Sequence, residues 1–242
     1  MVGNRSDRFR LQQDYERSMQ IAIDGPAAAG KSTVSQELAR RLGFNYIDTG
    51  AMYRALTLLA IDNNIDCSDE PGLVSLIDRH NIEFDGTKIL VDGDDVSRKI
   101  RGEQVTALVS YCCAPRGVRQ RMVALQQKIA GETDSVMEGR DIGTVVLPNA
   151  DLKIYMTATR RERAIRRKTD PSNPELKEAA IEKIEQDIET RDRIDSTREV
   201  DPLKVADDAI VMDTTGMSIS EVADKIIEIL HFNHKPKTPR ST

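Results

Sequence analysis

The sequence is poor in cysteine and histidine and has no apolar run long enough to span a membrane. Its three cysteines are Cys67, Cys112 and Cys113. An odd count without metal-ligand spacing predicts reduced thiols in a cytosolic protein. The three histidines are scattered along the chain, which argues against a zinc site. These absences exclude a membrane-spanning protein and a zinc-built domain.

Charge of neither sign dominates the composition. The 242 residues include 35 Lys and Arg against 40 Asp and Glu, a net charge of −5. This balance gives no bulk attraction to nucleic acid or to an anionic membrane, so an anion site must be a local cluster of arginine. The length suits one α/β domain with insertions and a sizeable core. We expect a monomeric, cytoplasmic enzyme with no nucleic-acid or membrane partner.

Both ends of the chain differ from its interior. Residues 1–18 are polar and Arg-rich and lack the apolar segment of a secretory signal. Residues 232–242 are largely basic and contain prolines. We expect both segments to be disordered.

Residues 25–32 read Gly-Pro-Ala-Ala-Ala-Gly-Lys-Ser and fit the phosphate-binding P-loop pattern. The alternative is a chance glycine-rich turn before a helix, but the segment follows an apolar run and precedes a helical pattern, as the motif requires. Gly25 and Gly30 would let the backbone form a nest of N–H donors at a helix N-terminus. Lys31 would reach the β- and γ-phosphates, and the Ser32 hydroxyl would bind Mg²⁺. The predicted triphosphate-binding residues are Gly25, Pro26, Ala27, Ala28, Ala29, Gly30, Lys31, Ser32 and Thr33.

Strands and helices alternate along the interior, which predicts an α/β fold with a parallel sheet covered on both faces. Ser218 and Glu221 form a capping-box pattern at the start of the last helix. The expected strands are 20–24, 44–47, 135–138, 152–157 and 209–212, and the expected helices of this core are 32–42, about 51–63 and 219–230.

Residues 65–132 interrupt this alternation and look like an insertion between two parts of a core, 19–64 and 133–231. Residues 82–91 predict a hairpin with its turn at Asp85-Gly86, and a helix from 118 to about 130 returns the chain to the core. Insertions on a P-loop core usually build the second-substrate site. The alternative is a purely structural elaboration.

Two polar segments directly follow predicted strands, where ligands collect in sheets of this kind. In residues 48–54, Thr49 offers a hydroxyl and Arg54 could hold an anionic group, although a capped helix with a surface arginine is commoner. In residues 138–144, Arg140 can donate to a phosphate and Asp141 can accept from an exocyclic amine. These two can also form a structural ion pair, but their glycine-flanked loop favours function.

Two further segments carry grouped charges. Residues 160–174 combine a basic helix with a turn-rich run, which predicts a mobile lid that brings arginines onto the triphosphate; an isolated basic helix would instead be a solvated face. Arg191, Asp195 and Arg198 share a helix face. Either Asp195 is a hydroxyl acceptor held by arginines or the three form an exposed salt-bridge ladder, and the spacing does not choose. The arginines of the basic helix are Arg160, Arg161, Arg163, Arg166 and Arg167.

Together these segments resemble the bacterial cytidylate kinase family in order and spacing, over about residues 19–230. The run Gly-Arg-Asp-Ile-Gly-Thr-Val-Val at 139–146 and the long insertion are more specific to that family than the P-loop. The segments that carry the resemblance are 25–33, 48–54, 118–119, 138–146, 162–167 and 191–198.

The resemblance implies a P-loop kinase fold, with a central parallel sheet flanked by helices, an inserted subdomain that binds the nucleoside monophosphate, and an Arg-rich lid. Cytosine presents N4 as a donor and N3 and O2 as acceptors, which a carboxylate with an arginine complements. Two positions depart from the family: Ala28 stands where many relatives have Gly, and Thr49 where many have Ser, a change that could alter pyrimidine or deoxyribose preference. The implied contacts are cytosine with Ser110, Arg119 and Asp141, near Thr49; sugar with Arg191 and Asp195; and CMP phosphate with Arg54, Arg140 and Arg198.

The resemblance thus implies ATP-dependent phosphorylation of CMP and dCMP to CDP and dCDP, with ATP as co-substrate and Mg²⁺ as cofactor. The expected catalytic residues act by positioning and charge neutralisation. Another P-loop kinase of the shikimate or gluconate type would not need the long insertion. A non-enzymatic nucleotide switch would carry an Asn-Lys-x-Asp segment, which is absent. The expected catalytic residues are Lys31, Arg140, Arg198, Arg163 and Arg167.

Overall fold

The computed structural model describes residues 18–131, 133–173 and 176–233. Of the predicted disordered segments 1–18 and 232–242, residues 1–17 and 234–242 lie outside these residues, as does Pro174 at the end of the predicted lid. Among the described residues, none of the helices is long and apolar enough to cross a membrane.

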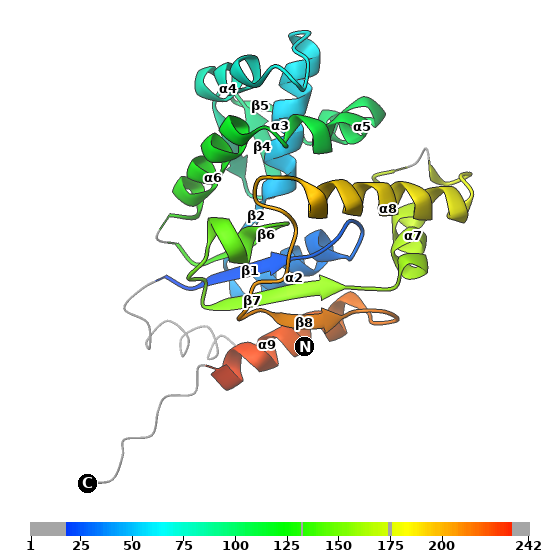
Figure 1. The fold of residues 1–242 in the computed structure, drawn as a ribbon. Helices are drawn as coiled ribbons and strands as arrows, with labels where there is room; N and C mark the ends of the chain where they lie inside the picture. Colours follow the sequence, from blue (N-terminus) through cyan, green and yellow to red (C-terminus); the bar gives the residue numbers. More distant parts are fainter. Residues whose placement is uncertain (1–17, 132, 174–175, 234–242) are drawn as a thin grey trace.

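A parallel sheet forms the base of the molecule (Figure 1). Its strands lie in the order β2-β6-β1-β7-β8, and every neighbouring pair is parallel. The central strand, β1, is buried along most of its length and its three inner residues are apolar, because both of its faces are covered. This confirms the predicted α/β class. The strands are β1 Gln20–Asp24, β2 Asn45–Asp48, β6 Ser135–Gly139, β7 Leu152–Thr157 and β8 Ile210–Asp213.

The two faces of the sheet are covered by different elements. Ile21 and Ile23 of β1 pack in one apolar cluster with α2 (Lys31–Leu42) and α9 (Ile219–Asn233). Ala22 packs on the opposite face with the short helical segment η2 (Ile142–Val146). Side chains alternate across a strand, so one strand serves both layers.

Helix α9 begins with the predicted capping box. The Ser218 N–H donates to Glu221 Oε2 at 2.8 Å, and the Glu221 N–H donates back to Ser218 Oγ at 3.3 Å. The helix continues through Phe232 and Asn233, which the sequence analysis assigned to the tail.

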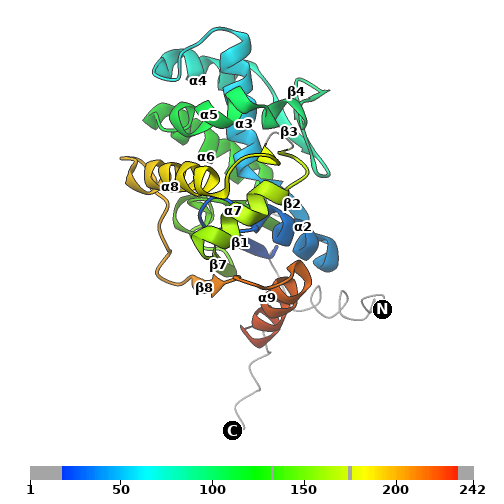
Figure 2. The same cartoon turned by 90° about the vertical axis from the view of Figure 1, so that its right-hand side faces the viewer.

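The inserted segment forms a second layer, which Figures 1 and 2 show above the sheet. Buried side chains of α3 belong to the same apolar cluster as those of α4, α5 and α6, so α3 packs with the insertion although the sequence grouped it with the core. The hairpin turn is Gly86-Thr87, one residue later than predicted, because Asp85 pairs with Lys88. The elements are α3 Thr49–Asp62, α4 Glu70–Arg79, β3 Ile82–Asp85, β4 Lys88–Val91, β5 Asp94–Asp95, η1 Lys99–Arg101, α5 Glu103–Cys112 and α6 Arg116–Ala130.

Two helices occupy the space between the sheet and the inserted layer (Figure 2). Helix α7 (Arg160–Thr169) covers most of the predicted lid, and α8 (Ile181–Thr197) carries two of the three grouped charges at 191–198. Ala164 packs against Ile184 and Ile188 in a small apolar cluster that joins the two helices. The basic helix is therefore anchored on one side by α8.

The cysteines differ from the prediction of reduced thiols. Cys67, in the loop between α3 and α4, forms a disulfide with Cys112 at the end of α5, and Cys113 is a buried free thiol. The prediction was wrong because it rested on the odd count. The partners are 45 residues apart in sequence, and only the packing of the insertion brings them together.

We predict that Cys67→Ser lowers the free energy of unfolding by about 2–4 kcal/mol, because the disulfide restricts a long loop of the unfolded chain. Urea denaturation of both proteins, with and without dithiothreitol, measures this. Reductant should shift the wild-type midpoint to that of Cys67→Ser and leave the variant unchanged. A wild-type midpoint that ignores reductant would contradict the prediction.

Candidate active site

The loop between β1 and α2 has the conformation that a P-loop needs. A Cβ atom on Gly25 would lie 2.1 Å from the Met156 carbonyl oxygen, so only glycine fits there. Gly30 caps α2 with a left-handed φ of 91°. Ala28 is also left-handed, with φ 60°, at a position that the motif leaves free. The loop therefore turns back on itself just before the N-terminus of α2.

Most of the predicted site residues line a cavity of ≈ 700 Å³ that opens beside this loop. The exceptions are Gly25, Pro26 and Arg163. The predicted residues that line it are Ala27, Ala28, Ala29, Gly30, Lys31, Ser32, Thr33, Thr49, Arg54, Ser110, Arg119, Arg140, Asp141, Arg167, Arg191, Asp195 and Arg198.

The cavity is positively charged although the chain is acidic overall. Nine cationic side chains and five carboxylates stand among the described residues that line it. Burial, and then the charge of Arg140, lower the pKa of Lys31 to about 7 and that of Arg191 to about 10. Burial, and then Arg191, lower the pKa of Arg54 to about 9. An anion in the cavity would offset this repulsion.

Two of these cations have spare hydrogen-bonding capacity. The Lys31 side chain is 5% exposed and donates to the Pro26 carbonyl at 2.9 Å, one contact for an ammonium group with three donors. The Nε atom of Arg191 is buried without a hydrogen-bond partner in the described part of the chain. Unpaired buried donors are costly, so both groups suit a bound anion.

Three carboxylates lie at or one residue before the ends of neighbouring strands, a feature that the sequence analysis did not use. The strand register places Asp48 of β2 opposite Glu138 of β6, with Asp24 of β1 one residue further on. Burial, and then the charge of Asp48, raise the pKa of Glu138 to about 7; Tyr46 donates to it at 2.6 Å. Burial raises the pKa of Asp24 to about 6, and it accepts from the N–H groups of Ile142 and Gly143. The sequence signal that could have identified them is an acidic residue near the C-terminal end of a strand in a parallel sheet, where ligands bind.

Asp195 lies at the centre of the grouped charges at 191–198. It is 4% exposed and accepts from Arg140 Nε at 2.8 Å and from Ser110 Oγ at 3.4 Å. Burial opposes its ionisation, but Arg140 and Arg191 together lower the pKa of Asp195 below its usual range. The alternative of an exposed salt-bridge ladder is therefore wrong. The helix also ends at Thr197, so Arg198 lies just beyond it.

Asp141 is buried and lines the cavity, but it does not form the ion pair with Arg140 that the sequence analysis weighed as an alternative, because Arg140 pairs with Asp195. Its two oxygens accept from Arg119 Nη2 and from Arg198 Nη2, the latter at 3.3 Å. Arg119 is 1% exposed, and its guanidinium lies 5.4 Å from the centre of the Tyr53 ring. Its Nε also donates to Asp201, a residue that the sequence analysis did not name.

Two further predicted residues, Thr49 and Arg54, bind neighbouring backbone or hydroxyl groups. The Thr49 hydroxyl donates to the Glu138 carbonyl at 2.8 Å. Arg54 donates to Thr106 Oγ1 at 3.0 Å and to the Ile100 carbonyl at 3.4 Å. These bonds fix both side chains at the cavity wall.

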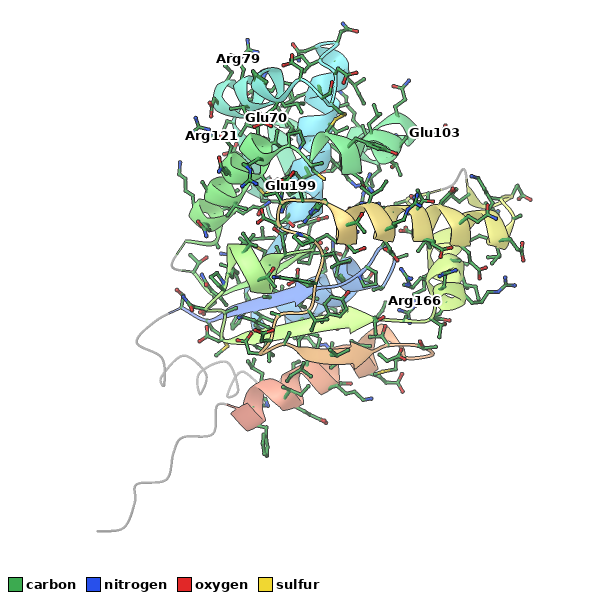
Figure 3. The ribbon with its side chains drawn as sticks, in the orientation of Figure 1. Glu70, Arg79, Glu103, Arg121, Arg166 and Glu199 are labelled. Atoms are coloured by element: carbon green, nitrogen blue, oxygen red, sulfur yellow. A yellow bond between two sulfur atoms is a disulfide. The ribbon has the colours of Figure 1, made fainter. Side chains whose placement is uncertain are left out.

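The arginines of α7 divide into two groups. Arg163 does not line the cavity; it donates to the Ala27 carbonyl at 3.0 Å and pairs with Asp192. Arg166 lines the cavity at the foot of α7 (Figure 3) and donates to the Ala29 carbonyl at 3.0 Å. Arg167 also lines it. The sequence analysis expected Arg163 and Arg167 to be catalytic and did not select Arg166, because the sequence does not show how α7 is rotated on α8.

Known proteins match most of this chain. The sequence model of the cytidylate kinase family matches residues 21–232. A cytidylate kinase of Lactobacillus johnsonii is 51% identical over 221 residues, 90% of this chain and 96% of that protein. A cytidylate kinase of Bacillus subtilis is 47% identical over 217 residues, 88% of this chain and 96% of that protein. A solved structure of an uncharacterized Eubacterium ventriosum protein, 12% identical, superposes with a TM-score of 0.50 over 88% of this chain and 98% of that chain, which concerns the fold alone. The chain belongs to the cytidylate kinase family.

Proposed function

We propose that this chain transfers the γ-phosphoryl group of ATP to CMP and dCMP, forming CDP and dCDP. The observation that carries the proposal is the surplus of cationic side chains lining one cavity, which the P-loop also lines. A triphosphate and a monophosphate together supply the negative charge that such a cavity lacks. Membership of the cytidylate kinase family supports the choice of acceptor.

The ATP half of the cavity is formed by residues 25–33 and the N-terminus of α2. Backbone N–H groups and the helix dipole favour phosphate there. Lys31 would contact the β- and γ-phosphates, where the anion restores its full positive charge. Arg166 and Arg167 line the same cavity from α7 and would meet the phosphates from the opposite side.

The CMP half is formed by the insertion, the loop after β6 and the end of α8. Asp141 with Arg119 complements the cytosine edge, near Ser110 and Thr49. Asp195 and Arg191 would hold the sugar hydroxyls. Arg54, Arg140 and Arg198 would hold the CMP phosphate, which is why so many cations converge there.

The donor groups near Lys31 fit Mg²⁺, which prefers oxygen ligands and keeps several waters. Ser32 offers a hydroxyl, and the Asp48 and Glu138 carboxylates line the same cavity. No cluster of three or more His, Cys, Asp or Glu side chains that could hold a metal stands among the described residues, so phosphates and water would complete the coordination. When bound, Mg²⁺ neutralises charge on the β- and γ-oxygens.

The reaction needs positioning more than proton transfer. A CMP phosphate oxygen attacks the γ-phosphorus, and the bond to the β-phosphate oxygen breaks. The attacking phosphate is already ionised, so no strong general base is required. Lys31, Arg140 and Arg198 stabilise the charge that develops on the transferred group. Arg163 acts indirectly, because it donates to the Ala27 carbonyl and so holds the backbone of the P-loop.

The proposal includes a monomer in the cytoplasm, where both nucleotides are available. Light scattering on purified protein tests the monomer. The cytoplasm keeps most thiols reduced, so the Cys67–Cys112 disulfide would be an exception there. Thiol trapping during cell lysis tests the location and the redox state together.

Acceptor choice follows from Asp141 and Arg119. CMP and dCMP should be phosphorylated well, UMP poorly and AMP hardly at all, because a site built on buried hydrogen bonds rejects analogues that leave its groups unpaired. A coupled assay with ATP and each monophosphate measures this. AMP as the best acceptor would overturn the proposed function.

Lys31→Ala should reduce turnover by about 10²–10³-fold or more, as expected for loss of a charge aimed at the transition state. The variant should stay folded, because burial opposes the Lys31 charge and its removal relieves that cost. Steady-state kinetics and a thermal melt measure the two effects. The exposed Lys183→Ala is the control, and near-normal turnover of a folded Lys31→Ala would remove Lys31 from the mechanism.

Asp195→Ala should raise the KM for CMP and leave that for ATP nearly unchanged. It removes an acceptor for the sugar and frees Arg140, so kcat should fall too. Loss of a charged hydrogen bond of about 1.5–3 kcal/mol corresponds to roughly one to two powers of ten in kcat/KM. Asp187→Ala is the matched control, because Asp187 lies on the same helix and forms an exposed ion pair with Lys183. Wild-type constants for CMP would return Asp195 to a structural role.

A further inference from the structure

Asp201 connects two of the arginines at the CMP half of the cavity without lining that cavity itself. Its carboxylate accepts from Arg119 Nε at 2.9 Å, and its carbonyl accepts from Arg198 Nε at 2.8 Å. Asp141 accepts from Nη2 of the same two arginines. Hydrogen bonds therefore link the four residues in a closed ring, in which the carboxylate of Asp201 contacts Arg119 and its backbone carbonyl contacts Arg198.

The ring joins three segments that are distant in sequence. Arg119 comes from α6 of the insertion, Asp141 from the loop after β6, and Arg198 and Asp201 from the loop after α8. Arg119 is 1% exposed and the Arg198 side chain 6% exposed. Two buried guanidinium groups on one carboxylate would leave one charge uncompensated, and Asp201 supplies the second anion.

The backbone of Asp201 is what allows one residue to reach both arginines. It has a left-handed φ of 49° and precedes Pro202, a combination that few residues tolerate. Aspartate and asparagine adopt this conformation more readily than other side chains that carry a Cβ. Strain of this kind persists where the surroundings hold it, and it is commonest at functional sites.

We propose that Asp201 is a positioning residue for the acceptor nucleotide. Its carboxylate accepts from Arg119 Nε, so Arg119 donates only its Nη2 group to the Asp141 carboxylate. Asp141 then keeps a lone pair free for the cytosine amine, since a carboxylate can accept about four hydrogen bonds. The proposal rests on the proposed function and adds to it the residue that sets the Asp141–Arg119 geometry.

Asp201→Asn tests this, because it removes the charge and keeps the size and the left-handed backbone. We expect the KM for CMP to rise about tenfold, the effect of weakening one charged hydrogen bond, with the KM for ATP unchanged. The preference for CMP over UMP should fall, because the carboxylate that distinguishes them is less available. Asp201→Gly, which also tolerates the left-handed backbone, should show the same pattern.

Glu199→Gln is the matched control. Glu199 lies on the same loop (Figure 3) and also pairs with an arginine of α6, Arg116, but both side chains are exposed and such pairs contribute little. Its constants should equal those of the wild type. A merely structural role for Asp201 would lower the melting temperature without separating the two KM values.

The outcomes distinguish this inference from the proposed function. If the wild type does not phosphorylate CMP, the proposed function fails, and the role of Asp201 fails with it. If the wild type is active and folded Asp201→Asn has unchanged constants for CMP and an unchanged preference over UMP, the role of Asp201 alone is overturned. A selective rise in the KM for CMP with reduced discrimination against UMP supports it.

Discussion

The site depends on holding many cations together in a poorly solvated cavity. A guanidinium or ammonium group loses several kcal/mol of hydration energy on burial unless an anion is near. The lowered pKa values of Lys31, Arg54 and Arg191 express that cost. The fold tolerates it because strand-end carboxylates and the buried aspartates are arranged around the same space. The cavity is therefore suited to a strongly anionic ligand before any ligand arrives.

The arginines that are expected to hold CMP are already held by the protein. Arg140 is fixed by Asp195, and Arg119 and Arg198 by Asp141. These ion pairs reduce the side-chain entropy lost on binding, since long flexible side chains otherwise have to be ordered by the ligand. They also impose a competition, because a phosphate must share each guanidinium with its carboxylate. Arg has five donors in a fixed fork, so Arg140 can keep Asp195 and still donate to a phosphate.

Much of the fold could be predicted from the sequence, and the limits have physical causes. The strands 20–24 and 152–157 were placed to the residue, because apolar runs bounded by polar residues are local signals. The disulfide was missed because pairing of Cys67 with Cys112 depends on the packing of distant segments. Arg163 was placed on the triphosphate because helical spacing gives a shared face but not the direction of that face. Asp201 carries no local pattern, and only the assembled structure joins it to Arg119.

Helix α8 gives the two halves of the cavity a common support. Asp192 accepts from the Ala27 N–H of the P-loop at 3.0 Å and pairs with Arg163 of α7. Asp195, one helical turn later, holds Arg140 and Ser110 on the other half. Because packed helices move as rigid units, a displacement of α8 that loosens the P-loop also disturbs the groups for the acceptor. One element therefore sets the position of the P-loop relative to Arg140 and Ser110.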